Sequence, residues 1–388
     1  MAGLSTYTPL TAASITEAHS KIEQYINRTD LITSQPIDQL ASSSQPRSVF
    51  LPSNSKISPP SNTNPNALAP PRFNIYFKFR GAFHALTRLI EDQGIDQFRS
   101  RGVTTAWSGN HAQGLALAAA TFDVPAFIVM PRNSTRSKIE GVAKILGISG
   151  ELGDSGGKGG KGEITFCGSS NGEKKAAVEE MVRREDCVFV PPYNHPDIIL
   201  GQGTCALELE EQFIEMRTGK SGAALDAVIA PIGGGGLLGG IATWFREKPD
   251  IKIFGAEPSF QGADDARRGL LQNARIEHVS SSTIADGLRT PVGELNWKIV
   301  SDKTKVEGVF AVGEEEIKMA MRVIYEELGM LVEPSGCVPL VVVLFDKDFR
   351  EMVAREASDR GGRAWNVAIV FSGGNTTMEA MQDVIEEV

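Results

Sequence analysis

Apolar runs of strand length alternate with longer amphipathic segments along most of this chain. The short runs predict strands at Ala126–Met130, Cys187–Val190, Ala227–Ile232, Ile251–Ala256 and Val367–Phe371. The longer segments predict helices at His111–Thr121, Glu173–Arg184, Gly203–Thr218 and Glu314–Leu328. Strands that alternate with helices are typical of an α/β fold with mostly parallel sheets, in which ligands bind at the carboxyl ends of the strands.

Two segments differ in composition from this alternating pattern. Residues Ala41–Arg72 contain eight serines, seven prolines and four asparagines, so they have little apolar surface to bury and we expect a mobile surface loop over 41–72. Residues Gly150–Gly162 contain seven glycines together with Lys158 and Lys161. We expect an inserted flexible loop over 150–162 rather than a second phosphate site.

The composition is that of an ordinary globular protein, with 41% hydrophobic and 22% charged residues in 388. A net charge of -9 without a basic block argues against partners such as nucleic acid or an anionic membrane. The sequence has neither an apolar run of membrane length nor a secretion signal, so we expect a cytoplasmic protein. The cysteines at 167, 187, 205 and 337 are scattered, which argues against a zinc or redox site.

Four consecutive glycines, Gly233–Gly236, lie between a predicted strand and an apolar segment that predicts a buried helix. Without Cβ atoms the backbone can turn sharply and direct several N–H groups toward one phosphate. The positive end of the helix dipole adds to that attraction. We therefore predict a phosphate-binding loop at this strand end.

The same loop also fits a dinucleotide fingerprint. Gly234, Gly236 and Gly239 have the spacing G-x-G-x-x-G, and the next predicted strand leads to the acidic Glu257. A nicotinamide-dependent dehydrogenase is therefore an alternative function.

Two further polar turns follow strand-like runs. Ser108–Gly114 reads Ser-Gly-Asn-His-Ala-Gln-Gly and opens a helical segment, and Ser108 can exchange a proton with a nearby carbon. Ser372–Asn375 follows the last predicted strand, and the Ser372 hydroxyl can bind a ring nitrogen. Three such turns at strand ends indicate a shared site.

Lys78 lies among apolar residues immediately before a helical segment. Burial lowers the pKa of a lysine and leaves a neutral amine that can attack an aldehyde. A lysine that extends from a strand end into solvent is the alternative interpretation.

Together these residues resemble the fold-type II pyridoxal-phosphate enzymes, in particular the serine racemase and serine/threonine dehydratase group. The resemblance extends from about Pro9 to the last residue, apart from the two low-complexity segments. It implies a two-lobed, tryptophan synthase β-like fold with twisted, mostly parallel sheets flanked by helices. The large cofactor domain would comprise 1–101 and 195–388, and the small domain 102–194. We also expect a small amino-acid substrate and a homodimer.

The resemblance implies a role for each motif residue. Lys78 occupies the place of the lysine that forms the Schiff base, in the pattern Phe-Lys-x-Arg-Gly-Ala. Ser108 corresponds to the serine that donates and accepts a proton opposite the lysine, and Asn110 to the asparagine that contacts the ring hydroxyl of the cofactor. Ser372 would bind the pyridine nitrogen, and the cofactor phosphate would be held by Gly233, Gly234, Gly235, Gly236 and Leu237.

A divalent cation site is implied as well. Glu257-Pro258-Ser259 and the following Ala263-Asp264-Asp265 are similar to the cation-binding segment of the group. The ligands would be Glu257, the Ala263 carbonyl and Asp265, with water. Such hard oxygen ligands suit Mg²⁺, Mn²⁺ or Ca²⁺. A surface acidic cluster is the alternative.

Three more segments, Gly201–Thr204, Ile284–Gly287 and Glu333–Gly336, are similar to segments of racemases and dehydratases. The resemblance thus implies α,β-elimination of L-serine or L-threonine to a 2-oxo acid and ammonia, with Lys78 as the base. Serine racemisation results if Ser108 returns a proton to Cα from the opposite face.

The chain departs from the family just before the lysine. The family has a strand that ends in Phe-Lys, then a loop containing Glu-Asn-x-Gln-x-x-Gly, and only then the motif with the Schiff-base lysine. Here Ile75–Lys78 continues directly into Phe79–Ala82, so Lys78 corresponds to the strand lysine, to the cofactor lysine or to a fusion of both. An inactive or weakly active pyridoxal-phosphate-binding paralogue is therefore a further alternative.

Overall fold

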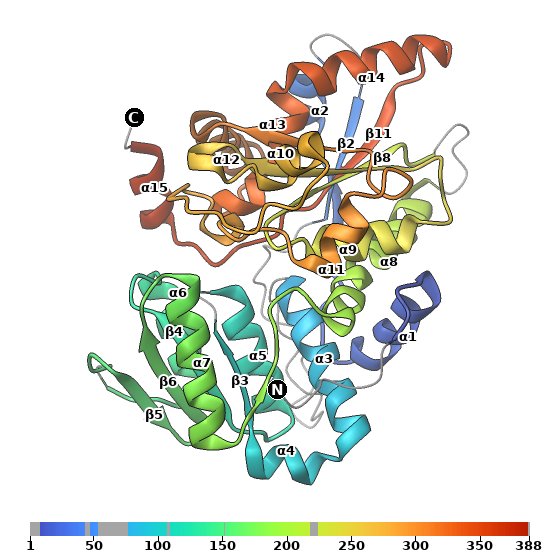
Figure 1. Cartoon of the computed structure of the whole chain (residues 1–388). Helices are drawn as coiled ribbons and strands as arrows, with labels where there is room; N and C mark the ends of the chain where they lie inside the picture. Colours follow the sequence, from blue (N-terminus) through green and yellow to red (C-terminus); the bar gives the residue numbers. More distant parts are fainter. Residues whose placement is uncertain are drawn as a thin grey trace, which may run out of the picture. The chain divides into compact units, whose positions relative to one another are not determined.

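A computed structural model describes residues 8–42, 47–52, 77–106, 109–150, 152–217 and 224–386. The chain divides into two compact units, Met1–Ile22 with Ile75–Gln202 and Glu23–Asn74 with Gly203–Val388. The sequence assigned 1–101 to the larger domain, whereas residues 75–101 fall here in the unit that also contains 102–194. The assignment from the sequence stays a prediction. In each unit the main strands are parallel and helices pack on the sheet (Figure 1).

The first unit contains a five-stranded sheet in the order β5-β6-β4-β3-β7. All pairings are parallel except the antiparallel pairing of β5 with β6 at one edge. The strands are β3 Val103–Ala106, β4 Ala126–Pro131, β5 Gly156–Gly159, β6 Gly162–Cys167 and β7 Val188–Phe189. The helices are α1 Ala12–Ile22, α3 Phe77–Gln93, α4 Ile95–Arg101, α5 Asn110–Thr121, α6 Arg136–Leu146 and α7 Asn171–Glu185, and α8 Pro196–Arg217 begins in this unit.

The second unit contains a six-stranded sheet in the order β1-β2-β11-β8-β9-β10, parallel except for the edge strand β1. Its strands are β1 Leu31–Thr33, β2 Arg47–Pro52, β8 Ala227–Pro231, β9 Lys252–Pro258, β10 Gly308–Val312 and β11 Trp365–Ile369. Its helices are α2 Gln35–Ala41, α9 Gly236–Phe245, α10 Asp265–Gln272, α11 Glu294–Val300, α12 Glu314–Leu328, α13 Pro334–Phe345, α14 Lys347–Asp359 and α15 Met378–Glu386, with short 3₁₀ turns η1 Phe260–Gly262 and η2 Asp286–Leu288.

The core of the second unit forms between its sheet and helix α13. Every residue of α13 from Ser335 to Leu344 is buried, and the helix packs on β8, β9 and β10. The central strands β8 and β11 are buried along their whole length, as parallel strands covered on both faces must be.

Among the described helices, none combines the length and apolar character needed to cross a membrane.

The alternating pattern located the main parallel strands and several helices correctly. All five predicted strands exist as β4, β7, β8, β9 and β11, and the helix predicted at Glu314–Leu328 has the bounds of α12. Helix α8 begins at Pro196, seven residues before the predicted start at Gly203. Proline is favoured in the first turn because its missing N–H has no partner there anyway. The prediction of an α/β fold with mostly parallel sheets is confirmed.

The prediction of a mobile loop over 41–72 is wrong for part of that segment. Ala41 ends helix α2, and Arg47–Pro52 forms strand β2 between β1 and β11. The apolar stretch Val49-Phe50-Leu51 was hidden in the average composition, and pairing on both sides satisfies its backbone. Residues 43–46 and 53–72 lie outside the described residues.

The prediction of a flexible loop over 150–162 is also wrong for most of that segment. Its glycines form the hairpin of β5 and β6, and Gly156 and Gly162 have φ of 113° and 149°. A Cβ at Gly156 would overlap the carbonyl oxygen of Ile164, and one at Gly162 would overlap that of Ala126. The glycines therefore permit close backbone pairing rather than disorder.

Candidate functional site

The glycine run lies, as predicted, between strand β8 and helix α9. Gly235 has φ 88° and is the residue before the helix, and no side chain caps the helix N-terminus. A Cβ at Gly235 would lie 2.8 Å from Cβ of Asn296, and one at Gly233 would lie 3.0 Å from Cα of Leu288. A side chain at either of these two positions would therefore be crowded, and the first N–H groups of α9 lack acceptors within the helix. A phosphate group fits this loop because it would accept hydrogen bonds from those N–H groups.

Side chains and backbone of the segment that leads into α11 hold the glycine loop in place. Nδ2 of the fully buried Asn296 donates to the carbonyl of Gly234 at 2.6 Å. The N–H of Gly293 donates to the same carbonyl at 3.1 Å. The sequence carries no signal for this role of Asn296, because a lone asparagine in a helical segment belongs to no motif.

Ser372 lies at the same end of the sheet as the glycine loop. Strands β11 and β8 pair in parallel with Ile369 opposite Ile229, and both polar turns follow their carboxyl ends. Ser372 is buried, with 3% of its surface exposed. The second unit therefore brings together two of the predicted cofactor-binding turns.

Glu333 orders the turn that contains Ser372. The N–H of Glu333 donates to the carbonyl of Gly373 at 2.9 Å, and the N–H of Asn375 donates to Oε1 of Glu333 at 2.8 Å. A Cβ at Gly336 would lie 3.1 Å from the N atom of Ser372, so the start of α13 packs directly on this turn. The sequence had marked Glu333–Gly336 only as similar to related segments, and its role as a support for Ser372 became visible only in the fold.

Glu257 and Asp265 form a buried carboxylate pair in the second unit. Glu257 is the penultimate residue of strand β9 and accepts hydrogen bonds from the N–H groups of Ala266 and Arg267, at 3.2 and 2.7 Å. Asp265 accepts from the N–H of Val292 at 3.0 Å. Burial raises the pKa of Glu257 well above its usual value, and the charge of Asp265 adds to this effect. Burial also raises the pKa of Asp265 to about 6.

A divalent cation would relieve the repulsion between these two carboxylates. The carbonyl of Ala263 is the third predicted ligand. Ala263 is fully buried and precedes Asp265 by two residues in the sequence. Within the described ranges, no three His, Cys, Asp or Glu side chains converge to hold a metal ion. A cation here would therefore be held by two carboxylates, a carbonyl and water, which is a donor set that suits Mg²⁺ or Ca²⁺.

Lys78 lies in the first turn of helix α3, in the first unit. The interpretation as a lysine at a strand end is wrong for Phe77 and Lys78, because both belong to this helix; Ile75 and Tyr76 lie outside the described residues. Burial lowers the pKa of Lys78 to about 8, although part of the side chain keeps some exposed surface. Its Nζ lies 5.0 Å from the ring centroid of Phe77. A substantial fraction of this amine is therefore neutral just above neutral pH.

The loop that opens helix α5 lies in the same unit as Lys78. Asn110 is the first residue of α5, whereas Ser108 lies outside the described residues. His111 is fully buried, and burial together with the charge of Lys78 lowers its pKa to about 3. Its Nε2 lies 3.4 Å from the carbonyl oxygen of Val190. His111 therefore stays neutral at physiological pH and cannot serve there as a cationic acid.

Comparisons with known proteins agree with the resemblance. Residues 77–358 match the family described as pyridoxal-phosphate dependent enzyme. A serine racemase of Arabidopsis thaliana is 34% identical over 371 residues, which cover 95% of this chain and 94% of that protein. A beta-hydroxyaspartate dehydratase of Paracoccus denitrificans is 31% identical, with 94% and 96% covered. The structure of maize serine racemase superimposes with a TM-score of 0.75 at 30% identity, and the match covers 97% of each chain.

Proposed function

This chain belongs to the family of pyridoxal-phosphate dependent enzymes, and from this premise we propose that it catalyses α,β-elimination of L-serine or L-threonine. The products are a 2-oxo acid and ammonia, and serine racemisation is a second outcome at the same site. The observation that carries the proposal is the glycine loop at Gly233–Gly236, which shares one end of a parallel sheet with Ser372.

The resemblance gives each candidate residue a task. Bound pyridoxal phosphate supplies an electron sink that makes the α-proton of an amino acid acidic. The N–H groups that follow Gly235 would bind its phosphate, and the Ser372 hydroxyl would bind its ring nitrogen as a neutral partner. Lys78 would hold the cofactor and, as a neutral amine, take the α-proton. Asn110 would contact the ring hydroxyl, and Ser108 would return a proton to Cα from the other face in racemisation.

The substrate class follows from the chemistry and from the names of the relatives. Elimination of water needs a hydroxyl on Cβ, which serine, threonine and hydroxyaspartate all carry. Among the relatives are the serine racemase and the beta-hydroxyaspartate dehydratase named above, and an L-threo-3-hydroxyaspartate ammonia-lyase of Saccharomyces cerevisiae that is 29% identical. We therefore propose a 3-hydroxy amino acid as substrate, with serine and threonine first.

The dinucleotide alternative has less support. In that reading Glu257 would bind a ribose hydroxyl, but both its carboxylate oxygens accept N–H groups from the start of α10, and 1% of its surface is exposed. The family match covers the glycine loop as well. The inactive paralogue is the alternative that an experiment must separate from the enzyme.

We expect the purified protein to bind added pyridoxal phosphate and to form a 2-oxo acid from L-serine, L-threonine or L-threo-3-hydroxyaspartate. Cofactor binding is measured by absorbance and by borohydride reduction followed by mapping of the labelled lysine, and turnover by 2-oxo acid and ammonia release. D-serine formation measures racemisation. Binding at Lys78 without turnover would identify the inactive paralogue. A protein that takes up no cofactor and reduces a nicotinamide nucleotide instead would overturn the proposal.

We expect a divalent cation to stabilise the protein through Glu257, the Ala263 carbonyl and Asp265. A ligand at about 100 times its Kd stabilises the folded state by about 2.7 kcal/mol, so millimolar Mg²⁺ or Ca²⁺ should raise the melting temperature by several degrees over an EDTA control. Asp265→Asn should lose this response. The matched control is Asp264→Asn, because Asp264 pairs with Arg268 at 2.8 Å instead. An equal response in both variants would exclude Asp265 as a ligand.

We further propose a cytoplasmic homodimer that needs neither nucleic acid nor membrane as a partner. The four cysteines are all free, which suits a reducing compartment. The net charge of -9 supports the absence of polyanionic partners. Sedimentation equilibrium of the cofactor-loaded protein measures the mass of the assembly.

A further inference from the structure

Gln202 of helix α8 is a buried amide without hydrogen bonds. None of its surface is exposed, and neither Oε1 nor Nε2 is hydrogen-bonded to any described residue. Burying an unpaired amide disfavours the folded state, and nearly all buried side-chain amides in proteins have a partner. An apolar side chain of similar shape, such as methionine, would avoid this cost. Packing alone therefore does not explain why position 202 is a glutamine.

The amide lies where α8 meets the helix that carries Lys78. A Cβ at Gly81 would overlap Nε2 of Gln202 and would lie 2.9 Å from its Cδ. A Cβ at Gly201 would lie 2.7 Å from Cα of Gly81, so the two helices meet at their backbones. Gly81 follows Lys78 by three residues, which is about one helical turn on the same side of α3. The unpaired amide thus faces the turn that presents Lys78.

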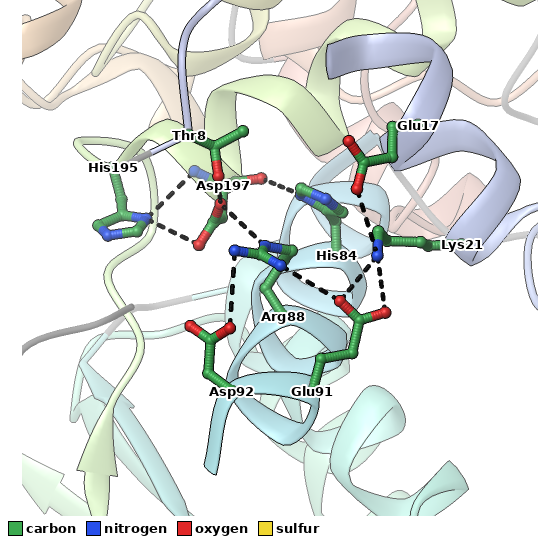
Figure 2. A network of polar contacts seen from close by, with 9 residues as sticks. All are labelled: Thr8, Glu17, Lys21, His84, Arg88, Glu91, Asp92, His195 and Asp197. Atoms are coloured by element: carbon green, nitrogen blue, oxygen red, sulfur yellow. Dashed lines mark hydrogen bonds and ion pairs between the residues drawn. The ribbon is translucent and has the colours of Figure 1, made fainter. Parts of the chain in front are cut away.

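The next turn of α3 is fixed to α8 by a polar network. His84 donates from Nδ1 to the carbonyl of Asp197 at 2.7 Å, and Arg88 lies toward the carboxylate of Asp197 (Figure 2). Burial lowers the pKa of His84 to about 4. The imidazole is therefore neutral around neutral pH, and the hydrogen bond from Nδ1 does not change with pH there. On the surface of the same helix, Lys21 of α1 pairs with Glu91 at 2.7 Å.

The first turn of α3 is also held from the side of α5. A Cβ at Gly114 would lie 3.1 Å from Cα of Phe79 and 3.4 Å from the carbonyl carbon of Lys78. Close backbone packing against Gly114 on α5 and Gly201 on α8, together with the His84 bond, thus holds the first turns of α3.

We propose that Gln202 is a positioning residue that holds the Lys78 turn of α3 in place for the cofactor. This inference rests on the proposed function of Lys78. An unpaired buried amide costs stability, and functional sites often retain such a cost. In the motif Gly201-Gln202-Gly203, Gly201 thus allows the close contact between the two helices, and Gln202 supplies the side chain that supports the Lys78 turn.

The test compares two glutamines of the same helix. Gln212 is also in α8, but its Nε2 donates to the carbonyl of Thr29 at 2.9 Å and its Oε1 accepts from the N–H of Leu31 at 2.8 Å. The variants Gln202→Met and Gln212→Met therefore remove an unpaired amide and an amide that is hydrogen-bonded at both Nε2 and Oε1. The readouts are the urea midpoint of the cofactor-free protein and the rate at which Lys78 captures added pyridoxal phosphate, from pH 7 to pH 10.

We expect Gln202→Met to have a urea midpoint equal to or above that of the wild type. Its capture rate should fall tenfold or more, because a misplacement of about 1 Å can reduce such a rate by roughly a hundredfold. The pH midpoint of capture should also move away from about 8, the pKa of Lys78 in the wild type. Gln212→Met should show the opposite pattern, with a lower urea midpoint and unchanged capture.

Wild-type capture by Gln202→Met would overturn the inference, whatever its stability. A lower urea midpoint together with slower capture would also overturn it, because lost packing then explains both effects. Failure of the wild-type protein itself to label Lys78 would instead contradict the proposed function, so the two failures are distinguishable.

Discussion

Lys78→Met is expected to lose 2-oxo acid formation by roughly 10²–10⁴-fold or more, because a positioned base contributes about that factor and the variant also lacks the attachment point of the cofactor. Borohydride reduction should then leave no cofactor attached at position 78. The measurement is turnover of L-serine with saturating cofactor, together with peptide mapping. Turnover at the wild-type level would show that another lysine holds the cofactor.

The same variant is expected to be more stable than the wild type below pH 8. The pKa of Lys78 falls from 10.5 in the unfolded chain to about 8 in the folded protein, so below pH 8 the folded state must bury a charged amine. At about 1.4 kcal/mol for each pKa unit, the cost is at most about 3 kcal/mol. It disappears as the pH rises from 8 to 10.5, where the amine is neutral in both states.

Urea unfolding of the cofactor-free proteins at pH 7 and pH 10 measures this difference. Lys347→Met is the matched control, because the side chain of Lys347 is 86% exposed and its replacement should change stability little at either pH. A gain for Lys78→Met that is equal at both pH values would show that packing, not the buried charge, is responsible.

Gly235→Ala is expected to reduce the affinity for pyridoxal phosphate by roughly ten- to a hundredfold. Gly235 has φ 88°, and an alanine there costs about 1–2 kcal/mol in backbone strain alone. The new Cβ would also lie 2.8 Å from Cβ of Asn296, so the loop must move away from α11. Titration of the cofactor-free protein with pyridoxal phosphate gives the Kd.

The control for this substitution is Gly308→Ala in strand β10. A Cβ at Gly308 meets no heavy atom within 4 Å, so this variant should bind the cofactor as the wild type does. If Gly235→Ala kept wild-type affinity, the glycine loop would not be the phosphate site.

Local sequence patterns were sufficient to locate the strands that end in the candidate site. Ala227–Ile232 and Val367–Phe371 are apolar runs bounded by small polar turns, and both are strands that are buried on both faces. The glycine run and Ser372 could be located because a sharp turn at a strand end needs a particular residue type. The family matches agree with the fold and cofactor that these motifs indicated.

Segments whose conformation depends on distant partners were assigned wrongly or not at all. Residues 156–162 are glycine-rich and resembled a linker, yet their neighbours in the sheet make them a hairpin. Strand β2 was hidden in a serine- and proline-rich stretch and exists because β1 and β11 pair with it. Composition averaged over a segment cannot report such pairing.

The chemistry-bearing residue types and their order along the chain could be read from the sequence, because backbone conformation at a glycine or a polar turn is a local property. The fold was needed to show that Asn296 and Glu333 hold two of the turns, that burial brings the pKa of Lys78 to about 8, and that the amide of Gln202 is unpaired. Burial, desolvation and hydrogen bonding of a side chain depend on residues far away in the sequence, and those neighbours are known only once the chain has folded.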